Sequence, residues 1–433
     1  MHREEEQMEQ HAALAAGKQF SPRHVERFPH GQGHRSMSAH LQVVREVLTP
    51  NFFPPRTERL PLMDALDRGL AETILAPRNL PPFDNSQMDG FAVRSASVKG
   101  RGTVLKVGAP VPAGNAPAPL PEDTAAPIMT GAMMPLGADA VIPIELAVPD
   151  VFPDPSAETT VELPPIAAGS YVRSAGDDIT AGECALTAGT HLGPRQLGLL
   201  AGLGMTEILT YRPLTVLLVT TGDEVIEPGD NLTAGKIYDA NNTLLESSMR
   251  QAGLAVIRAG IVSDDPAVLS DLLRRHAPYV DLIVTTGGVG EGAYEPVRQA
   301  LVTHNVDFSH VAIQPGGPQG VGTFDGTPIL AFPGNSVSCL ISFELFLRPI
   351  MSEMFGAPSR RVAFHAPLAQ PLTSPRNKHQ VRRGTFLPNG TVRLEGGAGS
   401  HLLAALARSN VLVHVPEGIT ELAEGAEVEV WAI

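Results

Sequence analysis

The spacing of hydrophobic residues changes several times along this chain, and each spacing predicts a different architecture. Residues 1–36 are polar and have no hydrophobic period, which predicts a disordered extension. Five of the 14 histidines lie there, but their irregular spacing favours disorder over a metal-binding tail. Leu41, Val44 and Val47–Leu48 then recur at helical spacing, and a second short helix is predicted over Leu62–Leu70.

The middle and last parts of the chain read differently. Between Thr73 and Thr190, proline and glycine interrupt short apolar runs about every ten residues, which predicts a β-barrel or sandwich. A helix is predicted over Gly193–Gly204, with Pro194 in its first turn. Residues 361–433 look β-rich again, with a hairpin turn at Asn389-Gly390 and a final strand over 426–432.

After Arg212, strands and helices alternate. The predicted strands cover 214–220, 255–262, 282–286 and 328–331, and the predicted helices cover 242–251, 267–275, 296–302 and 337–354. Such alternation predicts a mostly parallel, doubly wound sheet with helices on both faces.

Composition and charge narrow the class of protein. The 433 residues carry a net charge of −14, which disfavours nucleic acid or an anionic membrane as the main partner. Cys184 and Cys339 are too few for a disulfide scaffold, and no apolar run approaches the roughly 20 residues of a membrane-spanning helix. The acidic start does not resemble a signal peptide. We expect a multidomain cytoplasmic protein.

Three segments share the order apolar strand, tight glycine turn, helix. Their turns contain Gly222, Gly287–Gly288 and Pro333–Ser336. In an open α/β sheet, ligands bind beyond the carboxyl ends of the strands, where free backbone N–H groups hold phosphate. One such turn usually only connects two elements, but three on one sheet predict a phosphate or metal site.

Carboxylates flank two of these turns. Asp223 and Glu224 follow the first strand, and Glu291 and Glu295 follow the third. Each could be a solvated loop residue, but Mg²⁺ takes one or two carboxylates together with substrate phosphates. The sequence has no cysteine–histidine cluster with zinc spacing and no nucleophile elbow.

Seven motifs occur in an order that makes the chain recognisable. They are Asp84–Val93, Ile128–Ala132, Val172–Ile179, Thr221–Glu224, Ile237–Asn241, Thr286–Val289 and Phe332–Ser336. From about Met37 to Ile433 the chain resembles the molybdopterin molybdenumtransferase family, which includes the C-terminal part of gephyrin. The resemblance implies an enzyme that inserts molybdate into adenylylated molybdopterin and releases AMP with Mg²⁺.

The resemblance also implies a multidomain α/β plus β fold with an elongated N-terminal region. After the extension (1–36) it implies a linker domain (37–75 and 164–212), an inserted β-barrel domain (76–163), an α/β domain of the molybdopterin-adenylyltransferase type (213–357) and a small C-terminal β-barrel (358–433). The family is a homodimer whose cleft lies between the α/β domain of one subunit and the inserted β domain of the other. A molybdopterin adenylyltransferase and apo-molybdoenzymes are the implied protein partners.

The family's functional residues can be carried over by position. The resemblance implies catalytic roles for Asp89, Thr130, Asp178 and Glu224. It implies ligand binding by Ser86, Gly222, Asp223, Gly287, Gly288, Pro333, Gly334, Asn335 and Ser336. Metal binding is expected at Glu224, Asp178 and Glu295.

Four positions depart from the family pattern, and one of them is Ser336, which replaces a proline. Gly290 and Glu295 replace a serine and an aspartate, and Gly317 replaces a lysine within the apparent loop Gln314–Gly322. Two alternatives to the transferase therefore stay open: a divergent paralogue that binds or carries the pterin nucleotide, and a molybdopterin adenylyltransferase. Because loops tolerate side-chain changes, we expect Gly317→Lys to fold normally and to tighten anion binding.

Overall fold

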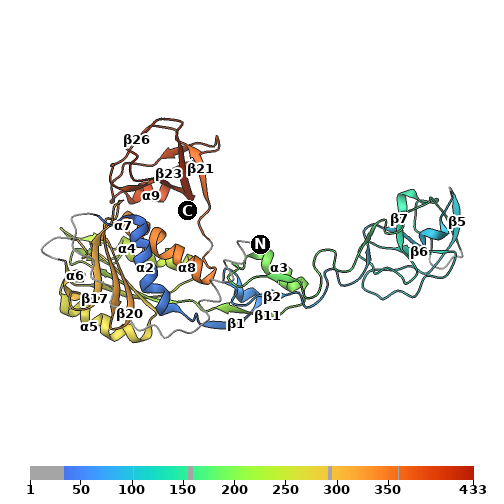
Figure 1. The fold of residues 1–433 in the computed structure, drawn as a ribbon, viewed down its shortest axis with the longest axis horizontal. Helices are drawn as coiled ribbons and strands as arrows, with labels where there is room; N and C mark the ends of the chain where they lie inside the picture. The colour runs from blue at the N-terminus through green and yellow to red at the C-terminus, as the bar shows by residue number, and fades with distance from the viewer. Residues whose placement is uncertain (1–33, 101, 155–158, 291–294, 359) are drawn as a thin grey trace.

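The protein is elongated, with its parts arranged along one long axis (Figure 1). The computed structural model describes residues 34–100, 102–154, 159–290, 295–358 and 360–433. An α/β domain with a smaller C-terminal β domain occupies one end, a second β domain occupies the other, and a narrow linker joins them. The predicted extension lies outside the described residues up to 33. Two residues of the predicted extension are nevertheless ordered: Arg35 forms a parallel β-bridge with Val311, and Ser36 caps the first helix.

The α/β domain is built on a six-stranded sheet. Its spatial order is β15 (Ala255–Val262), β12 (Thr215–Thr221), β16 (Leu282–Thr286), β20 (Thr327–Phe332), β19 (Pro318–Phe324) and β17 (Asn305–His310). The first four strands are parallel, and β19 and β17 extend the sheet with antiparallel pairing. The predicted parallel strands are confirmed, and the antiparallel edge is an addition that the alternation did not reveal.

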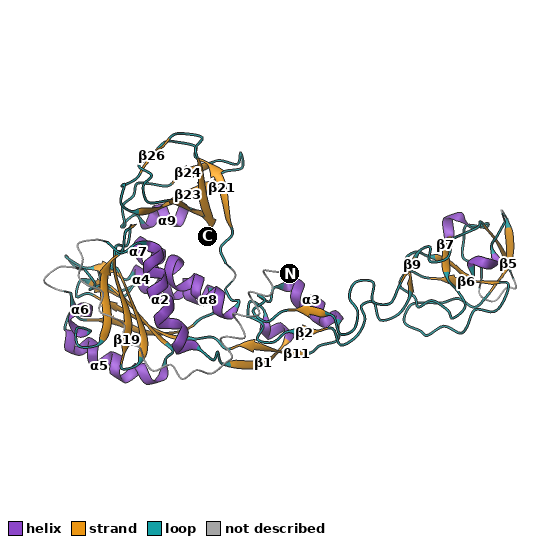
Figure 2. Ribbon diagram, viewed as in Figure 1, coloured by secondary structure: helices purple, strands orange, loops and turns teal. Residues whose placement is uncertain are grey.

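Helices cover both faces of this sheet, so the predicted doubly wound fold is confirmed (Figure 2). Val216 and Leu218 of β12 face one core, whereas Leu217 and Val219 face the other. The first core packs against α2 (Met37–Phe52), α4 (Ala240–Gln251), α7 (Ser336–Ser342) and α8 (Arg348–Phe355); the second packs against α5 (Pro266–His276) and α6 (Pro296–Ala300). Successive residues of a strand point to opposite faces, so a strand buried on both sides reads as a continuous apolar run.

Helix α2 packs on the α/β domain and not on the linker with which the sequence grouped it. Its buried side chains Val44, Leu48 and Phe52 join the first core of the sheet. The helical period identified the helix, but a periodic pattern does not say which surface the apolar face will cover.

The linker is made from two distant stretches of chain. Strand β1 (Thr57–Pro61) pairs antiparallel with β11 (Glu207–Tyr211), β2 (Ile74–Leu75) pairs with β10 (Cys184–Leu186), and helix α3 (Pro194–Gly202) packs beside them. The helix expected over Leu62–Leu70 is only a 3-10 turn, η1 (Leu62–Ala65). It stops because Leu66 is extended and Asp67 has a φ of 62°.

The remote β domain contains a five-stranded sheet. Its order is β7 (Ala140–Pro143), β4 (Gly90–Val93), β6 (Thr124–Ile128), β5 (Thr103–Val107) and β8 (Thr160–Leu163), and β3 (Asn85–Ser86) pairs with β9 (Val172–Arg173) beside it. Phe91 and Val93 face one core and Ala92 faces another. The paired Leu80 and Ile179 still belong to the linker, so this domain begins later in the chain than residue 76.

The C-terminal domain is joined to the α/β domain through a shared sheet. Its path is β18 (Ile313–Gln314), β23 (His379–Phe386), β25 (Val411–Val415), β27 (Glu427–Ala432) and β21 (Ala363–Pro367), with β24 (Val392–Leu394) on β23 and β22 (Leu372–Thr373) paired with β26 (Glu421–Leu422). The predicted hairpin at Asn389-Gly390 connects β23 and β24, and Gly390 has a φ of 81°. Helix α9 (Leu403–Arg408) lies between this domain and α7.

Two further expectations differ from the structure. The single helix predicted over 337–354 is α7 and α8 joined by a π-helical segment, η5 (Phe343–Leu347). The apparent loop Gln314–Gly322 contains Gln314 of β18 and most of β19. Short pieces complete the description: η2 (Ser95–Ser97), η3 (Ile144–Leu146), η4 (Ala277–Tyr279), β13 (Val225–Ile226) and β14 (Ile237–Tyr238). None of the helices described is long and apolar enough to cross a membrane.

Candidate functional site

The three glycine turns lie at one edge of the α/β sheet. They follow β12, β16 and β20, which are neighbours and parallel, so their carboxyl ends meet. Gly287 and Gly288 have φ values of 96° and 62°, and a Cβ on Gly287 would lie 2.9 Å from the Thr221 carbonyl oxygen. A Cβ on Gly334 would lie 3.4 Å from the Gly287 Cα. Glycine is therefore favoured at positions 287 and 288, where φ is positive and the turn lies close to Thr221, whereas the Gly334 turn is in ordinary contact with Gly287.

One asparagine holds two of the turns together. Asn241 Nδ2 donates to Thr286 Oγ1 at 2.9 Å and to the Gly334 carbonyl oxygen at 2.6 Å. Below them, the Cys339 thiol donates to the Pro333 carbonyl oxygen at 2.7 Å, and burial raises its pKa to about 12. Cys339 therefore supports the turn and has no nucleophilic character near neutral pH.

Two adjoining cavities open at this edge of the sheet. The smaller has a volume of about 240 Å³ and the larger about 650 Å³. Gly288, Glu295 and Gly334 line both, so the cavities share a wall formed by the turns after β16 and β20. All the predicted turn residues except Asp223 line one or both of them: Gly222, Gly287, Gly288, Pro333, Gly334, Asn335 and Ser336.

The smaller cavity is lined by four carboxylates: Glu224, Asp239, Asp264 and Glu295. Asp223 is not among the lining residues. It pairs with Asp264, because each backbone N–H donates to the other side chain, at 3.1 and 3.2 Å. Asp239 lies within the Ile237–Asn241 motif but was not among the predicted site residues. Asp239 is buried and caps α4 through the Asn242 N–H.

Gly290 and Glu295 fit one another. The Gly290 N–H donates to Glu295 Oε2 at 2.8 Å, and a Cβ on Gly290 would lie only 2.5 Å from Glu295 Oε1. The carboxylate thus occupies the space in which any side chain at position 290 would begin. The two departures from the family pattern are therefore in contact, and a side chain at position 290 would displace the Glu295 carboxylate from its present position.

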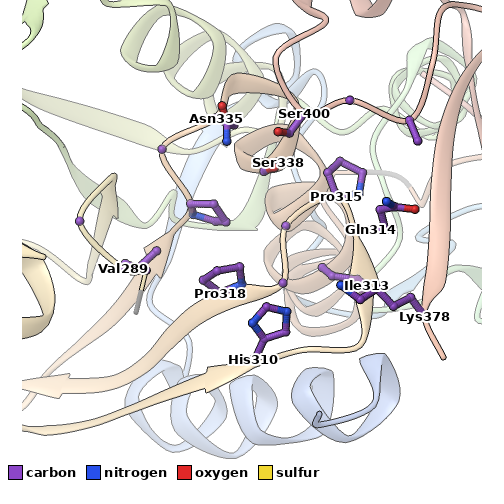
Figure 3. A pocket seen from close by; sticks show the side chains of 18 of the residues that line it. Val289, His310, Ile313, Gln314, Pro315, Pro318, Asn335, Ser338, Lys378 and Ser400 are labelled. Atoms are coloured by element: carbon purple, nitrogen blue, oxygen red, sulfur yellow. The ribbon is translucent and has the colours of Figure 1, made fainter. Parts of the chain in front are cut away.

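The lining of the larger cavity includes a lysine, a histidine, hydroxyl groups and the shared Glu295 (Figure 3). His310 comes from β17, Ser338 from α7, and Lys378 and Ser400 from the C-terminal domain. The parallel pairing of β18 with β23, Ile313 opposite His379, brings Lys378 to the cavity. Sequence reasoning missed His310, Ser338, Lys378 and Ser400, because they lie on four separate elements and no spacing connects them.

Two arginines lie behind the loop that carries Ser400. Arg382 Nη2 donates to the Gly396 carbonyl oxygen at 2.9 Å, and Arg383 Nη2 donates to that of Gly397. Arg383 is fully buried, and its Nε and Nη1 have no hydrogen-bond partner among the described residues. Burial lowers the pKa of both arginines. A buried guanidinium without a carboxylate partner favours an anion nearby. The sequence signal that could have revealed these residues is the pair of arginines within the strand pattern Gln380–Gly384.

In the remote β domain, Asp89 and Thr130 form a pair. Asp89 Oδ1 accepts from the Thr130 backbone N–H at 2.7 Å and from its hydroxyl at 2.9 Å, and these bonds lower the pKa of Asp89. The structure brings these two predicted residues together on an exposed loop. Ser86 is different: its buried hydroxyl donates to the Met88 carbonyl oxygen at 2.6 Å. Its predicted ligand contact is not supported, because the hydroxyl stabilises its own turn.

The structure does not bring the β domain to the cavities within one chain. The two lie at opposite ends of the molecule (Figure 1). Asp178 lies next to Ile179 of the linker core, and the lining of both cavities contains no residue before Thr220. Asp178 and Glu224 of one chain therefore cannot share a metal ion. Within the described residues, no three His, Cys, Asp or Glu side chains form a metal cluster.

Comparison with known proteins covers nearly the whole chain. Three family models match in succession: the MoeA N-terminal region (domain I and II) at residues 35–204, a probable molybdopterin binding domain at 217–353, and the MoeA C-terminal region (domain IV) at 365–433. Molybdopterin molybdenumtransferase 2 of Mycobacterium tuberculosis H37Rv is 39% identical over 411 residues, which is 92% of this chain and 99% of that protein. The Haemophilus influenzae molybdopterin molybdenumtransferase is 33% identical, covering 87% and 94%.

A solved structure supports the same fold. The molybdopterin biosynthesis moeA protein from Pyrococcus horikoshii OT3 superposes with a TM-score of 0.76 at 27% identity, covering 90% of this chain and 99% of that one. The likeness extends through the linker and both β domains, and not only through the α/β domain.

Proposed function

We propose that the chain, which belongs to the molybdopterin molybdenumtransferase family, inserts molybdate into adenylylated molybdopterin and releases AMP. The observation that carries the proposal is the pair of adjoining cavities, the smaller lined by four carboxylates and the larger by Lys378, by hydroxyl groups and by the shared Glu295. A nucleotide with a pyrophosphate suits the glycine turns. A tetrahedral dianion suits the larger cavity, whose lining includes Lys378 and Ser400.

Mg²⁺ fits the smaller cavity as an ion held jointly with substrate. Glu224 and Glu295 supply the one or two carboxylates that Mg²⁺ takes, and substrate phosphates would complete its ligands. When bound, the ion would neutralise the pyrophosphate as its P–O bond opens. Glu224 would hold it, while the turns at Gly287 and Gly334 orient the nucleotide beside the larger cavity. Asp178 of the same chain has no part in this ion.

The exposed Asp89–Thr130 pair belongs to a site that a second copy of the chain completes. Asp89 is ionised and fixed by two hydrogen bonds from Thr130, yet in its own chain nothing of the cavities lies near it. A carboxylate positioned in this way, in the β domain at the far end of the linker, suits contact with a ligand on another subunit. A two-fold dimer would place each remote β domain over the partner's α/β domain and create two equivalent sites.

Glu295 keeps a carboxylate in the lining of both cavities at the position where the family pattern has an aspartate, which supports a retained metal-dependent reaction. An adenylyltransferase is disfavoured, because the similarity to molybdenumtransferases also covers the linker, the remote β domain and the C-terminal domain.

The decisive experiment follows AMP release from adenylylated molybdopterin with and without molybdate and Mg²⁺. Molybdate-dependent AMP release is the expected result. Tight binding of the nucleotide without turnover would refute the transferase in favour of the carrier. The Glu224→Gln protein is the matched control and should release little AMP. It keeps the size of the side chain but cannot hold Mg²⁺ with a charged oxygen.

A further inference from the structure

The larger cavity is formed by two domains, whereas the smaller cavity is formed by one. Among the described residues, the lining of the smaller cavity runs from Thr220 to Ser336 and lies within the α/β domain. The larger cavity adds Lys378 and residues 398–400 from the C-terminal domain. The shape of the larger cavity therefore depends on how the C-terminal domain is seated on the α/β domain, while the shape of the smaller cavity is set within one domain.

Two hydrogen-bonded attachments between these domains lie at the larger cavity itself. Strand β18 pairs with β23 over only two residues, Ile313 and Gln314, and both line the cavity. At the start of α7, the Val337 N–H donates to the carbonyl oxygen of Ser400 at 3.3 Å. The C-terminal domain also adds apolar side chains to the first core of the sheet: Val381, Leu406 and Leu412. Apolar burial is non-directional, so it holds the domains together without fixing their relative tilt.

A third attachment is a buried ion pair away from the cavity. Glu344 lies in η5, and its side chain is fully buried. Arg361 lies in the connection that runs from α8 to β21 (Figure 1). Arg361 Nε donates to Glu344 Oε2 at 2.9 Å, and Nη2 donates to Oε1 at 2.7 Å. At about 1.5 Å of helix per residue, Glu344 lies roughly 9 Å along the axis from Ser338, which lines the cavity.

A second arginine already compensates the charge of Glu344. Arg348 is one helical turn further along, its Nε lies 3.7 Å from Glu344 Oε2, and its side chain is buried. The Nε and Nη1 of Arg348 have no hydrogen-bond partner among the described residues. Glu344 therefore has a cation within its own domain, and the contribution of Arg361 is a directional bond between the α/β domain and the chain that enters the C-terminal domain. A bidentate pair of this kind fixes both the distance and the plane of the two groups.

We infer that Arg361 and Glu344 are positioning residues for the larger cavity, because their bond sets the tilt of the C-terminal domain. Together with the two attachments at the cavity, it gives the domain a third fixed point. The tilt in turn sets the distance of Lys378 and Ser400 from the turns of the α/β domain. This inference rests on the proposed function, because it assumes that the larger cavity receives the oxyanion.

The test compares molybdate and AMP binding to the full-length protein by calorimetry, with Mg²⁺ present. In Arg361→Met, molybdate affinity should fall about tenfold or more, whereas AMP affinity should change less than about twofold because the smaller cavity lies within the α/β domain. Arg361→Lys keeps the charge but not the bidentate geometry, so its molybdate affinity should be intermediate. Arg393→Met is the matched control, because Arg393 pairs with Glu395 at 3.0 Å within the C-terminal domain. Neither affinity should change in that control.

Two further measurements separate positioning from folding. Arg361→Met should keep a melting transition, since Glu344 retains Arg348. The His379 N–H, which donates to the Ala312 carbonyl oxygen at 2.8 Å between the domains, should exchange with deuterium faster in Arg361→Met than in Arg393→Met. In steady-state AMP release, the apparent KM for molybdate should rise about tenfold and kcat should change less than about twofold, because bound molybdate itself bridges the two walls and restores their orientation.

Unchanged molybdate affinity in folded Arg361→Met would overturn the inference. Equal losses of molybdate and AMP affinity would also overturn it, because a general loss of structure weakens both. If Arg361→Met does not fold, the same comparison in Arg361→Lys decides. Failure of the proposed function looks different: selective loss of molybdate affinity in a protein that never releases AMP would retain the positioning role and reject the transferase. Molybdate-dependent AMP release with unchanged affinities in Arg361→Met would reject the positioning role alone.

Discussion

Replacing Asn241 by alanine should loosen the site much more than it destabilises the protein. The substitution removes two hydrogen bonds, to Thr286 Oγ1 and to the Gly334 carbonyl oxygen, each worth about 1 kcal/mol. It also removes a buried Oδ1 that has no partner among the described residues. Losing this unpaired oxygen should offset about 1 kcal/mol of the lost stability. The Gly334 carbonyl is on an exposed residue and can bond to water instead. The free energy of unfolding should therefore fall by only about 1 kcal/mol, or about 2–4 °C in melting temperature.

The effect on catalysis should be larger, because Asn241 fixes the distance between two turns that line both cavities. Misplacing a reacting group by about 1 Å can cost on the order of 100-fold in rate. We expect AMP release per folded molecule to fall between about 10- and 100-fold. Asn410→Ala is the control: it removes two similar bonds, to the Phe386 N–H and carbonyl, in the C-terminal domain. Unchanged AMP release in folded Asn241→Ala would refute the idea that Asn241 fixes the distance between the two turns.

Three further predictions follow from the site and its surroundings. Alanine at Glu224 should abolish most turnover, because this carboxylate lines the smaller cavity, and should leave the melting temperature nearly unchanged, because the side chain is exposed; a large loss of stability with intact activity would contradict this. Co-expressed Asp89→Ala and Glu224→Ala proteins should form mixed dimers with one intact site and about half the normal activity; mixed dimers without activity would exclude a shared site. Burial lowers the pKa of His414 to about 3 in the folded protein. As the pH falls, the unfolded protein therefore binds a proton at His414 before the folded protein does. Stability should be full above about pH 6.5 and decline as the pH falls towards 3, and urea titrations should show a weaker decline for His414→Gln.

Local patterns of the sequence determined the elements of the α/β domain. Strands such as Leu282–Thr286 are continuous apolar runs because both faces of the sheet are covered, and the glycine turns mark where each strand ends. Adjacent parallel strands end at one edge, so the turns at Gly222, Gly287 and Gly334 could be expected to meet without any knowledge of the folded chain. The motifs also identified Asp89 and Thr130 as site residues, and the structure added that they are hydrogen-bonded to each other.

Tertiary structure alone decided which side chains reach the cavities. Asp223 and Ser86 carry the right chemistry for ligand binding, but neighbouring backbone groups use their oxygens. The motifs could not reveal these contacts, because the geometry of each loop decides whether a backbone group or a ligand bonds to the side-chain oxygen.

The anion-binding wall is the clearest case of what sequence does not determine. His310, Ser338, Lys378 and Ser400 come from four elements, and they converge only because β18 carries the C-terminal domain onto the edge of the α/β domain. The missing side chain at Gly317 looked like a lost cation, yet the space belongs to His310 from the neighbouring strand. A sequence specifies which groups exist and which element each occupies. Their distances in space depend on long-range packing, which no local period or spacing encodes.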